Sequence, residues 1–196
     1  MTDPNPELGD ADEIRLVRTA RGDPAASGAA FDTLYRRHVA RVYRYCYART
    51  GSRSDAEDLT AETFLAALES LGRYRGRGSF AAWLLSIARH KCADHHRRRY
   101  AAHAAGHSES VETADALPDL VTPNPADAAE QSDLLGCIEK ALPDLSPGRR
   151  EALHLRFWAG LSVRETAAVM RRREGAVKML ISRAVADLRK RCLDEP

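Results

Sequence analysis

The chain of 196 residues has few aromatic residues and no long apolar segment. Aromatic residues make up 6% of it, whereas charged residues reach 30%. Because β-sandwiches need strands rich in Val, Tyr and Thr, this Ala- and Arg-rich composition favours small helical units. No apolar run approaches the ~20 residues that cross a bilayer, and the acidic, Pro-containing start is unlike a secretion signal. We therefore expect a cytoplasmic protein without membrane insertion.

Cysteine is scarce and scattered. The four cysteines, Cys46, Cys92, Cys137 and Cys192, form no C-x-x-C pair. This spacing predicts neither a disulfide framework nor a zinc ribbon, so we expect reduced thiols.

A metal site and catalytic motifs are also missing from the sequence. Cys92, His95 and His96 lie close together, but a fourth ligand at suitable spacing is absent and the surrounding arginines would oppose a dication. The chain has no nucleotide-binding glycine loop and no Ser/His/Asp arrangement. We expect no cofactor, no metal and no enzymatic activity.

The charges that are present divide the chain into blocks. Residues 1–28 hold three basic and six acidic residues, and residues 29–99 hold 14 basic and seven acidic ones. Residues 100–132 hold six acidic residues and no Lys or Arg, and residues 133–196 hold 13 basic and nine acidic ones. Two basic blocks around an acidic one suggest two modules that bind a polyanion, although ordinary solvated surface charge stays an alternative.

The acidic block has the composition of a flexible linker. Pro118, Pro123 and Pro125 interrupt any helix, and large apolar residues are few. The predicted organisation is an acidic extension (1–28), a helical domain (29–99), a linker (100–132) and a second helical domain (133–196). The fold class is therefore all-α, with two small domains that the linker allows to lie far apart.

The first domain contains a helix with an acidic face. After Gly51, the sequence from Ser54 to Glu57 has the form of a capping box. Asp58 and Glu62 are spaced i, i+4 and share a face, which suggests a contact with another protein. Solvated carboxylates without a partner are the alternative.

A loop rich in arginine and glycine follows this helix. Residues 73–80 read RYRGRGSF, so aromatic residues bracket the loop. Guanidinium groups neutralise phosphates, and aromatic faces accept unstacked bases, which predicts binding of unpaired nucleic acid. The next helix carries an apolar core face and ends in a cationic stretch at residues 89–99.

The second domain has the pattern of a helix-turn-helix. Ser162 is a good N-cap with Glu165 three residues on, and a longer helix follows the arginines at 171–173. In such a unit the second helix enters the major groove by its N-terminal end, while arginines contact phosphate. Two helices of a bundle without a DNA role stay an alternative.

Both sets of motifs, in this order, resemble the extracytoplasmic-function (group 4) sigma factors of the bacterial sigma-70 family. The resemblance to sigma region 2 lies in residues 55–64 (DAEDLTAETF), 73–84 (RYRGRGSFAAWL) and 87–99 (IARHKCADHHRRR). The resemblance to sigma region 4 lies in residues 142–147 (LPDLSP), 153–162 (LHLRFWAGLS) and 175–184 (GAVKMLISRA). The resemblance covers nearly all of the chain after residue 29.

The resemblance implies a subunit that binds core RNA polymerase, through the β′ clamp helices and the β flap, and opens promoter DNA. It assigns core-polymerase binding to Asp55, Asp58, Leu59, Glu62 and Phe64. It assigns the −10 element, including capture of a flipped base, to Tyr74, Arg75, Arg77, Ser79, Phe80, His90, Lys91, Asp94, Arg97 and Arg98. It assigns the −35 element to Arg171, Arg172, Arg173, Glu174, Ala176, Lys178, Met179 and Arg183. It also implies control by an anti-sigma factor, and a linker that threads the RNA-exit path.

Some residues depart from the family pattern. Ala61 and His90 stand where Gln and Asn are frequent in the family. Arg171 stands in place of the usual turn Gly, so a positive φ at this position would strain the turn. Thr166 and Ala176 replace common Ile and Thr, changes that bear on −35 selectivity.

Two other functions stay open at this point. The chain could be a stand-alone helix-turn-helix regulator that binds duplex DNA unaided, or a protein adaptor that does not bind DNA. The adaptor hypothesis leaves both basic blocks unexplained.

Overall fold

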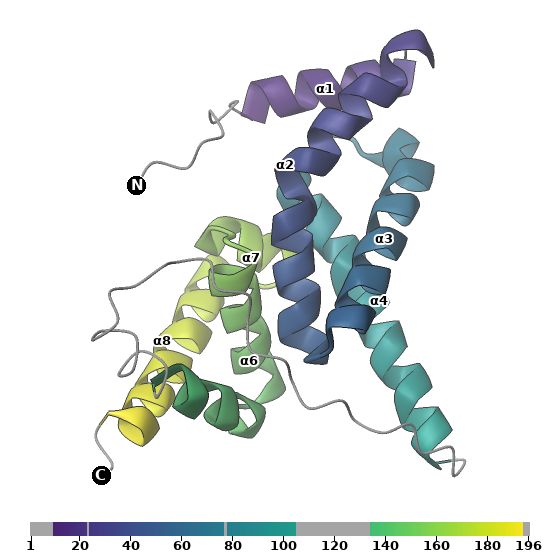
Figure 1. The fold of residues 1–196 in the computed structure, drawn as a ribbon. Helices are drawn as coiled ribbons and strands as arrows, with labels where there is room; N and C mark the ends of the chain where they lie inside the picture. Colours follow the sequence, from purple (N-terminus) through teal and green to yellow (C-terminus); the bar gives the residue numbers. More distant parts are fainter. Residues whose placement is uncertain (1–9, 23, 77, 105–133, 194–196) are drawn as a thin grey trace, which may run out of the picture.

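The computed structural model describes residues 10–22, 24–76, 78–104 and 134–193, and the regular segments among them are all helical (Figure 1). This confirms the predicted all-α fold class. None of the described helices is long and apolar enough to cross a membrane.

The first half consists of four long helices and a short one. They are α1 (Asp10–Gly22), α2 (Pro24–Thr50), α3 (Arg53–Ser70), the 3-10 helix η1 (Leu71–Arg73) and α4 (Phe80–Ala104). The second half begins with a helix at residues 134–141, here called helix 134–141. It continues with η2 (Leu142–Asp144), α6 (Pro147–Leu153), the π-helix η3 (His154–Trp158), α7 (Val163–Met170) and α8 (Glu174–Cys192).

Helix α1 and the start of α2 lie among the residues that the charge pattern assigns to the acidic extension, 1–28. Helix α1 packs on α2 and buries Val17, and α2 already begins at Pro24. The carboxylate of Glu13 lies 3.0 Å from Nε2 of His38 and 3.1 Å from Nε of Arg37. Burial alone would raise the pKa of Glu13, but the hydrogen bond with His38 and the charge of Arg37 outweigh it and hold the pKa below its ordinary value.

The N-terminus of α3 lies two residues earlier than the sequence pattern predicts. Ser52 is the N-cap, and its hydroxyl accepts a hydrogen bond from the backbone N–H of Asp55 at 3.3 Å. Gly51, with φ of 69°, makes the preceding turn. Ser54 therefore lies inside the first turn, because the glycine turn and not the Ser-x-x-Glu spacing decides where the helix begins.

The last helix of the first unit extends into the segment that the sequence assigns to the linker. Helix α4 continues to Ala104, five residues beyond the predicted domain end at residue 99. Residues 105–133, which include most of the predicted linker, lie outside the described residues.

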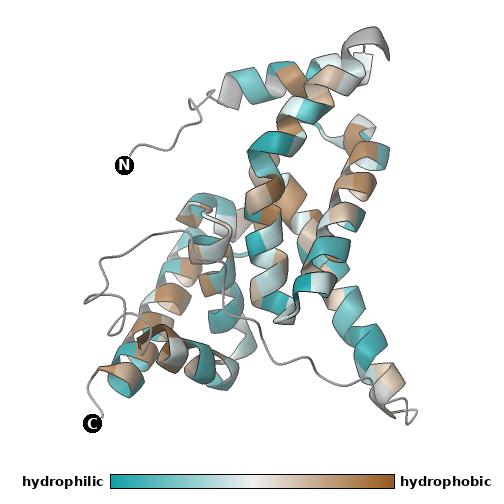
Figure 2. Ribbon diagram, viewed as in Figure 1, coloured by the Kyte–Doolittle hydropathy of each residue, from teal (hydrophilic) through white to brown (hydrophobic). Residues whose placement is uncertain are grey.

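The two helical units pack against each other, which the linker prediction did not anticipate. One buried core combines residues of α2, α3 and α4 with Leu155, Leu161 and Val169 of the second unit. Hydrophobic and hydrophilic residues alternate along the helices, so each helix has an apolar side to contribute (Figure 2). A smaller core, formed by Leu142, Leu145, Leu153 and Ala184, belongs to the second unit alone.

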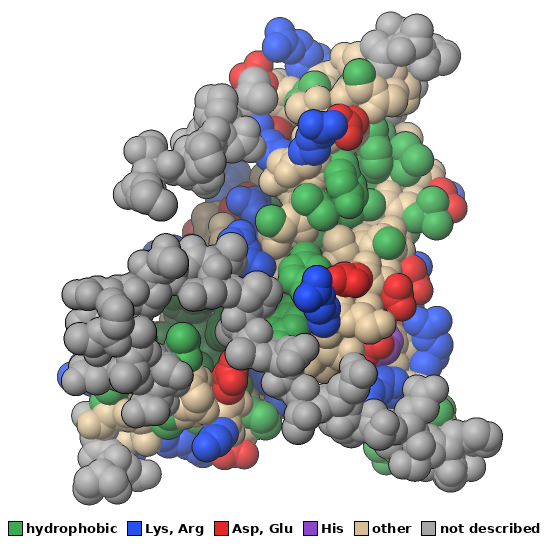
Figure 3. Space-filling view, viewed as in Figure 1, with side chains coloured by type: hydrophobic (Ala, Val, Ile, Leu, Met, Phe, Trp, Pro, Cys, Tyr) green, Lys and Arg blue, Asp and Glu red, His purple; other side chains and the backbone are tan. Residues whose placement is uncertain are grey.

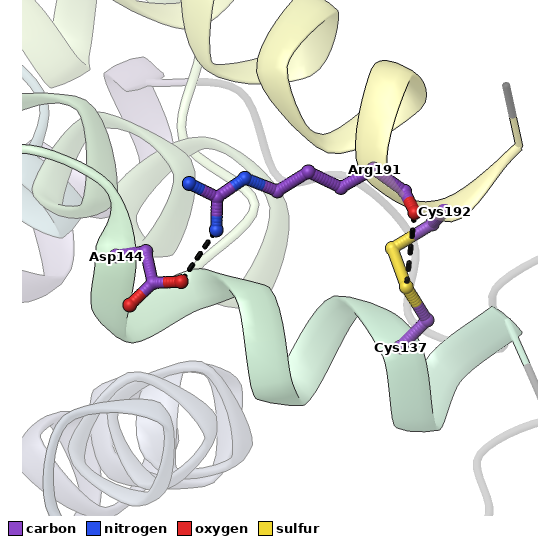
Figure 4. The surroundings of a disulfide bond; sticks show 4 residues. All are labelled: Cys137, Asp144, Arg191 and Cys192. Atoms are coloured by element: carbon purple, nitrogen blue, oxygen red, sulfur yellow. Dashed lines mark hydrogen bonds and ion pairs between the residues drawn. A yellow bond between two sulfur atoms is a disulfide. The ribbon is translucent and has the colours of Figure 1, made fainter. Parts of the chain in front are cut away.

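The prediction that all four cysteines are reduced thiols is wrong for one pair. A disulfide joins Cys137 of helix 134–141 to Cys192, the last residue of α8 (Figure 4). The sequence gives no sign of it, because the two cysteines are 55 residues apart and only the packing of helix 134–141 against α8 brings them together. Cys46 and Cys92 are free and buried.

Candidate nucleic-acid interface

The second unit contains the predicted helix-turn-helix, formed by α7 and α8. Ser162 and Glu165 form the full capping box: the Ser162 hydroxyl accepts from the backbone N–H of Glu165 at 3.2 Å, and the Glu165 carboxylate accepts from that of Ser162 at 2.8 Å. Both bonds satisfy donors that the first turn of α7 would otherwise leave free. The predicted N-terminus of this helix is confirmed.

Arg171 ends α7 in the left-handed region, with φ of 52° and ψ of 47°. Among the described residues it is the one non-glycine with positive φ. Side chains with a Cβ are strained in this conformation, which usually falls to Gly or Asn at a helix C-terminus. The expected strain at this turn is therefore present in the structure.

The residues predicted to read DNA form one exposed surface at the start of α8. Residues 171–176 are all exposed, as are Lys178, Met179 and Arg183. Val177 and Ala184, seven residues apart on the opposite side of α8, are fully buried and fix which side of the helix points outward. This surface presents five basic side chains beside a single carboxylate, that of Glu174, and two apolar ones.

The Arg- and Gly-rich loop lies between η1 and α4. Gly76 and Gly78 have φ of 68° and 82°, and the Tyr74 hydroxyl donates to the carbonyl of Gly78 at 2.9 Å, which closes the loop. Arg75 is exposed, and Arg77 lies outside the described residues. Tyr74 and Phe80 are 4% and 1% exposed and pack edge to face on each other, so in this conformation both rings belong to the core.

The end of α4 carries the other candidate residues for the −10 element. His90, Asp94, Arg97 and Arg98 are exposed, and Arg97 pairs with Asp94 one turn away. Lys91 is half-buried and lies 3.1 Å from the carboxylate of Glu62 in α3. Arg98 therefore presents its guanidinium group to solvent at the cationic end of α4.

The acidic face of α3 is only partly as predicted. Asp58 is exposed, whereas Glu62 pairs with Lys91 and Asp55 lies 3.3 Å from Nη1 of Arg99. Leu59 and Phe64 are 2% and 5% exposed, so in this conformation their side chains pack in the core of the first unit.

An exposed apolar surface, which the sequence analysis did not single out, lies next to that acidic face. Leu65 is 59% exposed, Leu68 is 48% and Tyr35 of α2 is 40%. Figure 3 shows hydrophobic side chains gathered over the upper parts of α2 and α3. The sequence feature that could have predicted this surface is the apolar stretch of α3, which is wider than one buried side of a helix. Exposed apolar surface of this kind marks protein contacts.

A buried carboxylate joins the two units. Glu151 of α6, 5% exposed, accepts a hydrogen bond from the Tyr45 hydroxyl at 2.8 Å and pairs with Arg49 and, at 3.3 Å, with Arg89. Burial and the nearby Glu151 charge raise the pKa of Tyr45 well above its ordinary value. A buried carboxylate is tolerated only with partners of this kind, so Glu151 holds α6 on α2 and α4.

The loop and the helix-turn-helix meet across a shared groove. The Ser79 hydroxyl, which also accepts from the backbone N–H of Ala82, donates to the Glu165 carboxylate at 2.5 Å. A groove of about 710 Å³ is lined by loop and α4 residues on one side, including Gly76 and His90, and by Arg164 and Arg171 on the other. With Ser79 and Glu165 in direct contact, a nucleic-acid strand cannot lie between them, so this arrangement is a closed one.

Two family models match the chain at the places where the motifs lie. Residues 34–101 match sigma-70 region 2, and residues 135–188 match sigma-70 region 4. The chain is 40% identical over 182 residues to the ECF RNA polymerase sigma factor BldN of Streptomyces coelicolor, covering 91% of this chain and 66% of the relative. It is 38% identical over 155 residues to the ECF RNA polymerase sigma factor SigD of Mycobacterium tuberculosis, covering 76% and 70%.

Solved structures have the same fold. The chain superposes on CnrH, solved in complex with the cytosolic domain of CnrY, with a TM-score of 0.62 and 26% identity, covering 91% of this chain and 94% of that one. It superposes on the sigma factor RpoE of Bartonella quintana, solved with the anti-sigma factor NepR, with a TM-score of 0.66 and 22% identity over 82% and 94% of the chains. The chain spans 66% of the length of BldN. It spans 65% of the length of the ECF RNA polymerase sigma factor SigE of Mycolicibacterium smegmatis.

Proposed function

Because the chain belongs to the sigma-70 family and to its extracytoplasmic-function type, we propose that it directs core RNA polymerase to promoters and promotes strand opening. It acts in the cytoplasm, where the polymerase and the chromosome are. The polymerase supplies the chemistry, and this chain supplies binding energy and specificity.

The observation that carries the proposal is the pairing of two different nucleic-acid surfaces in one chain. The exposed surface at residues 171–183 suits the major groove of a duplex, since it presents the start of a helix beside a row of arginines. The described loop residues 74–76, 78 and 79 and the end of α4 suit separated strands, since glycines and cations lie beside an aromatic cluster. A regulator that binds duplex DNA alone has no use for the second surface.

The polymerase contacts belong to α3 and its neighbourhood. Asp58 supplies exposed negative charge there, and Leu65 and Leu68 supply exposed apolar area. An interface of this kind combines an apolar centre with charged residues at its rim. We assign it to the β′ clamp helices, and the second unit to the β flap.

The same apolar surface is the candidate site for an anti-sigma factor. CnrH was solved with the cytosolic domain of CnrY, and RpoE was solved with the anti-sigma factor NepR. A partner that covers Leu65, Leu68 and Tyr35 excludes polymerase from α3 by competition. Pull-down of polymerase in the presence of such a partner measures that competition directly.

The closed arrangement has to open before both promoter elements are bound. Ser79 and Glu165 hold the two candidate DNA surfaces together, and Glu151 holds the units behind them. Binding to polymerase therefore includes the free energy of separating the units, which lowers the apparent affinity of the chain.

The test is run-off transcription by core polymerase with and without the chain, on promoters upstream of its own gene. Permanganate probing reports unpaired thymines. Specific transcripts together with an opened −10 region support the proposal, and Arg98→Ala then reduces opening more than duplex binding. Tight binding to duplex DNA without polymerase, with no opening and no assembly with core enzyme, favours the stand-alone regulator instead.

A further inference from the structure

The disulfide lies at the two ends of the second unit. Cys137 is in helix 134–141, the first described helix of that unit, and Cys192 closes α8, the last one (Figure 4). Their Cα atoms are 5.7 Å apart, within the range that a disulfide needs. Both cysteines are half-buried, so a small thiol reagent can reach them.

The remaining two cysteines are in the opposite situation. Cys46 and Cys92 are fully buried in the first unit, with their Sγ atoms 3.9 Å apart. The hydrogen bond with Cys92 and then burial raise the pKa of Cys46 far above its ordinary value, so its thiolate is not available. Because thiolate and access decide reactivity, the chain carries one inert pair and one accessible pair.

The accessible pair closes a unit with a small core of its own. Four buried residues form that core, with Ile138, Trp158, Ile181 and Leu188 packed around it. A surface ion pair at 2.5 Å between Asp144 and Arg191 joins the same two ends, but exposed pairs of this kind contribute little. A covalent link across 55 residues strongly restricts the unfolded chain. It therefore adds to the free energy of unfolding of a unit whose own core is small.

We propose that Cys137 and Cys192 are a reversible thiol–disulfide site, through which the redox state of the cell sets the stability of the unit that binds the −35 element. This rests on the proposed function, which assigns the −35 element to the second unit and, through work on a chromosomal promoter, puts the chain in a reducing compartment. Disulfides there are usually transient and redox-sensing. Oxidation ties helix 134–141 to the end of α8, and reduction releases it.

The oxidant is a low-molecular-weight disulfide of the glutathione class. The thiolate of one cysteine attacks a sulfur of that disulfide, forms a mixed disulfide and expels one small thiolate. The thiolate of the other cysteine then attacks the protein sulfur, the intramolecular bond forms, and the second small thiolate leaves. Two electrons pass from the two cysteines to the small disulfide, and the two protons end on the expelled thiolates.

The first experiment titrates the full chain with mixtures of reduced and oxidised glutathione, followed by quenching, alkylation under denaturing conditions and peptide mass analysis. Cys137 and Cys192 should pass together from alkylated to linked, with one midpoint, while Cys46 and Cys92 stay alkylated and serve as the internal control. The proposal is overturned if Cys137 and Cys192 remain alkylated at every ratio, each keep a separate glutathione, or stay linked in excess dithiothreitol.

The second experiment measures hydrogen exchange of the oxidised and the reduced chain. Oxidation should slow exchange in helix 134–141 and α8 on the order of 100-fold. Cys137→Ser/Cys192→Ser should show the reduced pattern under both conditions, and α3 should not change in either protein. Equal exchange in the oxidised and reduced chain contradicts the coupling. Neither experiment uses polymerase or promoter DNA, so their failure and a failure of the proposed function are told apart.

Discussion

The fold places some residues in environments that are unfavourable for their side chains, and the buried His154 is one of them. It is 3% exposed, its ring packs edge to face on Trp158 at 5.3 Å, and its Nδ1 atom is buried without a hydrogen-bond partner. Burial, and then the charges of Arg49 and Arg150, lower the pKa of His154 to about 3. The imidazole therefore stays neutral in the folded chain over the physiological range.

This predicts loss of stability in mild acid. The pKa of His154 is lower in the folded chain than in the unfolded one. As the pH falls from about 6.5 toward 3, this imidazole therefore takes up a proton only in the unfolded chain, and the free energy of unfolding falls through that window. From pH 7 to pH 5 the free energy of unfolding should drop by about 2 kcal/mol from His154 alone. Urea unfolding at both pH values measures it.

His154→Gln should flatten this dependence even where it lowers stability at pH 7. His90→Gln, which changes an exposed histidine of α4, should keep the slope of the natural chain. A slope that is the same in all three proteins shows that another group causes the acid sensitivity.

Arg171 gives a second prediction at the residue scale, because its φ of 52° strains the turn. Arg171→Gly should stabilise the chain by about 1 kcal/mol and raise the Tm by about 2–4 °C, since glycine adopts this conformation without a Cβ contact. Arg172→Gly removes the same charge one residue later, at a position without positive φ, and should not raise the Tm. Calorimetry decides between them, and equal losses in both variants contradict a strained turn.

At the scale of the helix, the sides of α3 differ in whether they pack inside the first unit, pair with α4 or face solvent. Ala56, Leu59, Thr63 and Ala67 are buried, and Glu62 and Asp55 are engaged by α4. Asp58 is left exposed on the side that the proposed function gives to the polymerase. Two of the five acidic residues of α3 thus pair with α4, and Asp58 is one of the three that stay exposed.

Reversal of charge at Asp58 should therefore weaken binding to core polymerase without affecting the fold. We expect Asp58→Lys to reduce affinity at least about tenfold, because a charge reversed at an interface adds like-charge repulsion. Glu57→Lys is the matched control: it is exposed on another side of α3, where it pairs with Arg53 at 3.0 Å. Fluorescence anisotropy with labelled chain measures both, and a similar loss in both variants argues against a specific face.

At the scale of the molecule, polar contacts between the described residues of the two units add to the apolar core that they share. Glu151 pairs with Tyr45, Arg49 and Arg89 of α2 and α4, and Ser79 donates to Glu165 of α7. Removing one member of a buried charge network leaves the others without compensation, which costs about 3–5 kcal/mol. The closed arrangement should be sensitive to this one carboxylate.

Glu151→Ala should shift the chain toward an open arrangement and increase its radius of gyration in small-angle X-ray scattering. Binding to core polymerase should then become tighter, because the units no longer have to be separated. Asp187→Asn is the control, since it removes an ion pair with Arg149 inside the second unit and leaves the interface intact. An unchanged radius in Glu151→Ala contradicts the role of this network.

The sequence by itself determined the helices, the helix-turn-helix and the basic surfaces. Periodicity and caps are local properties, so α7 begins at its predicted N-cap and the exposed residues at 171–183 could be named in advance. Motif order likewise identified the family, because a resemblance depends on residue types and their spacing. The start of α3 was missed by two residues, since a glycine turn competed with the expected cap.

Only the tertiary structure decided what lies together. The burial of Leu59, Phe64, Tyr74 and Phe80, the network around Glu151 and the Cys137–Cys192 bond all join residues distant in sequence. Burial depends on which sides of different helices meet, and a periodic pattern does not say whether an apolar side meets another helix or a partner. For the same physical reason, the charge pattern predicted two separate modules, whereas packing of their apolar sides joined them through one shared core.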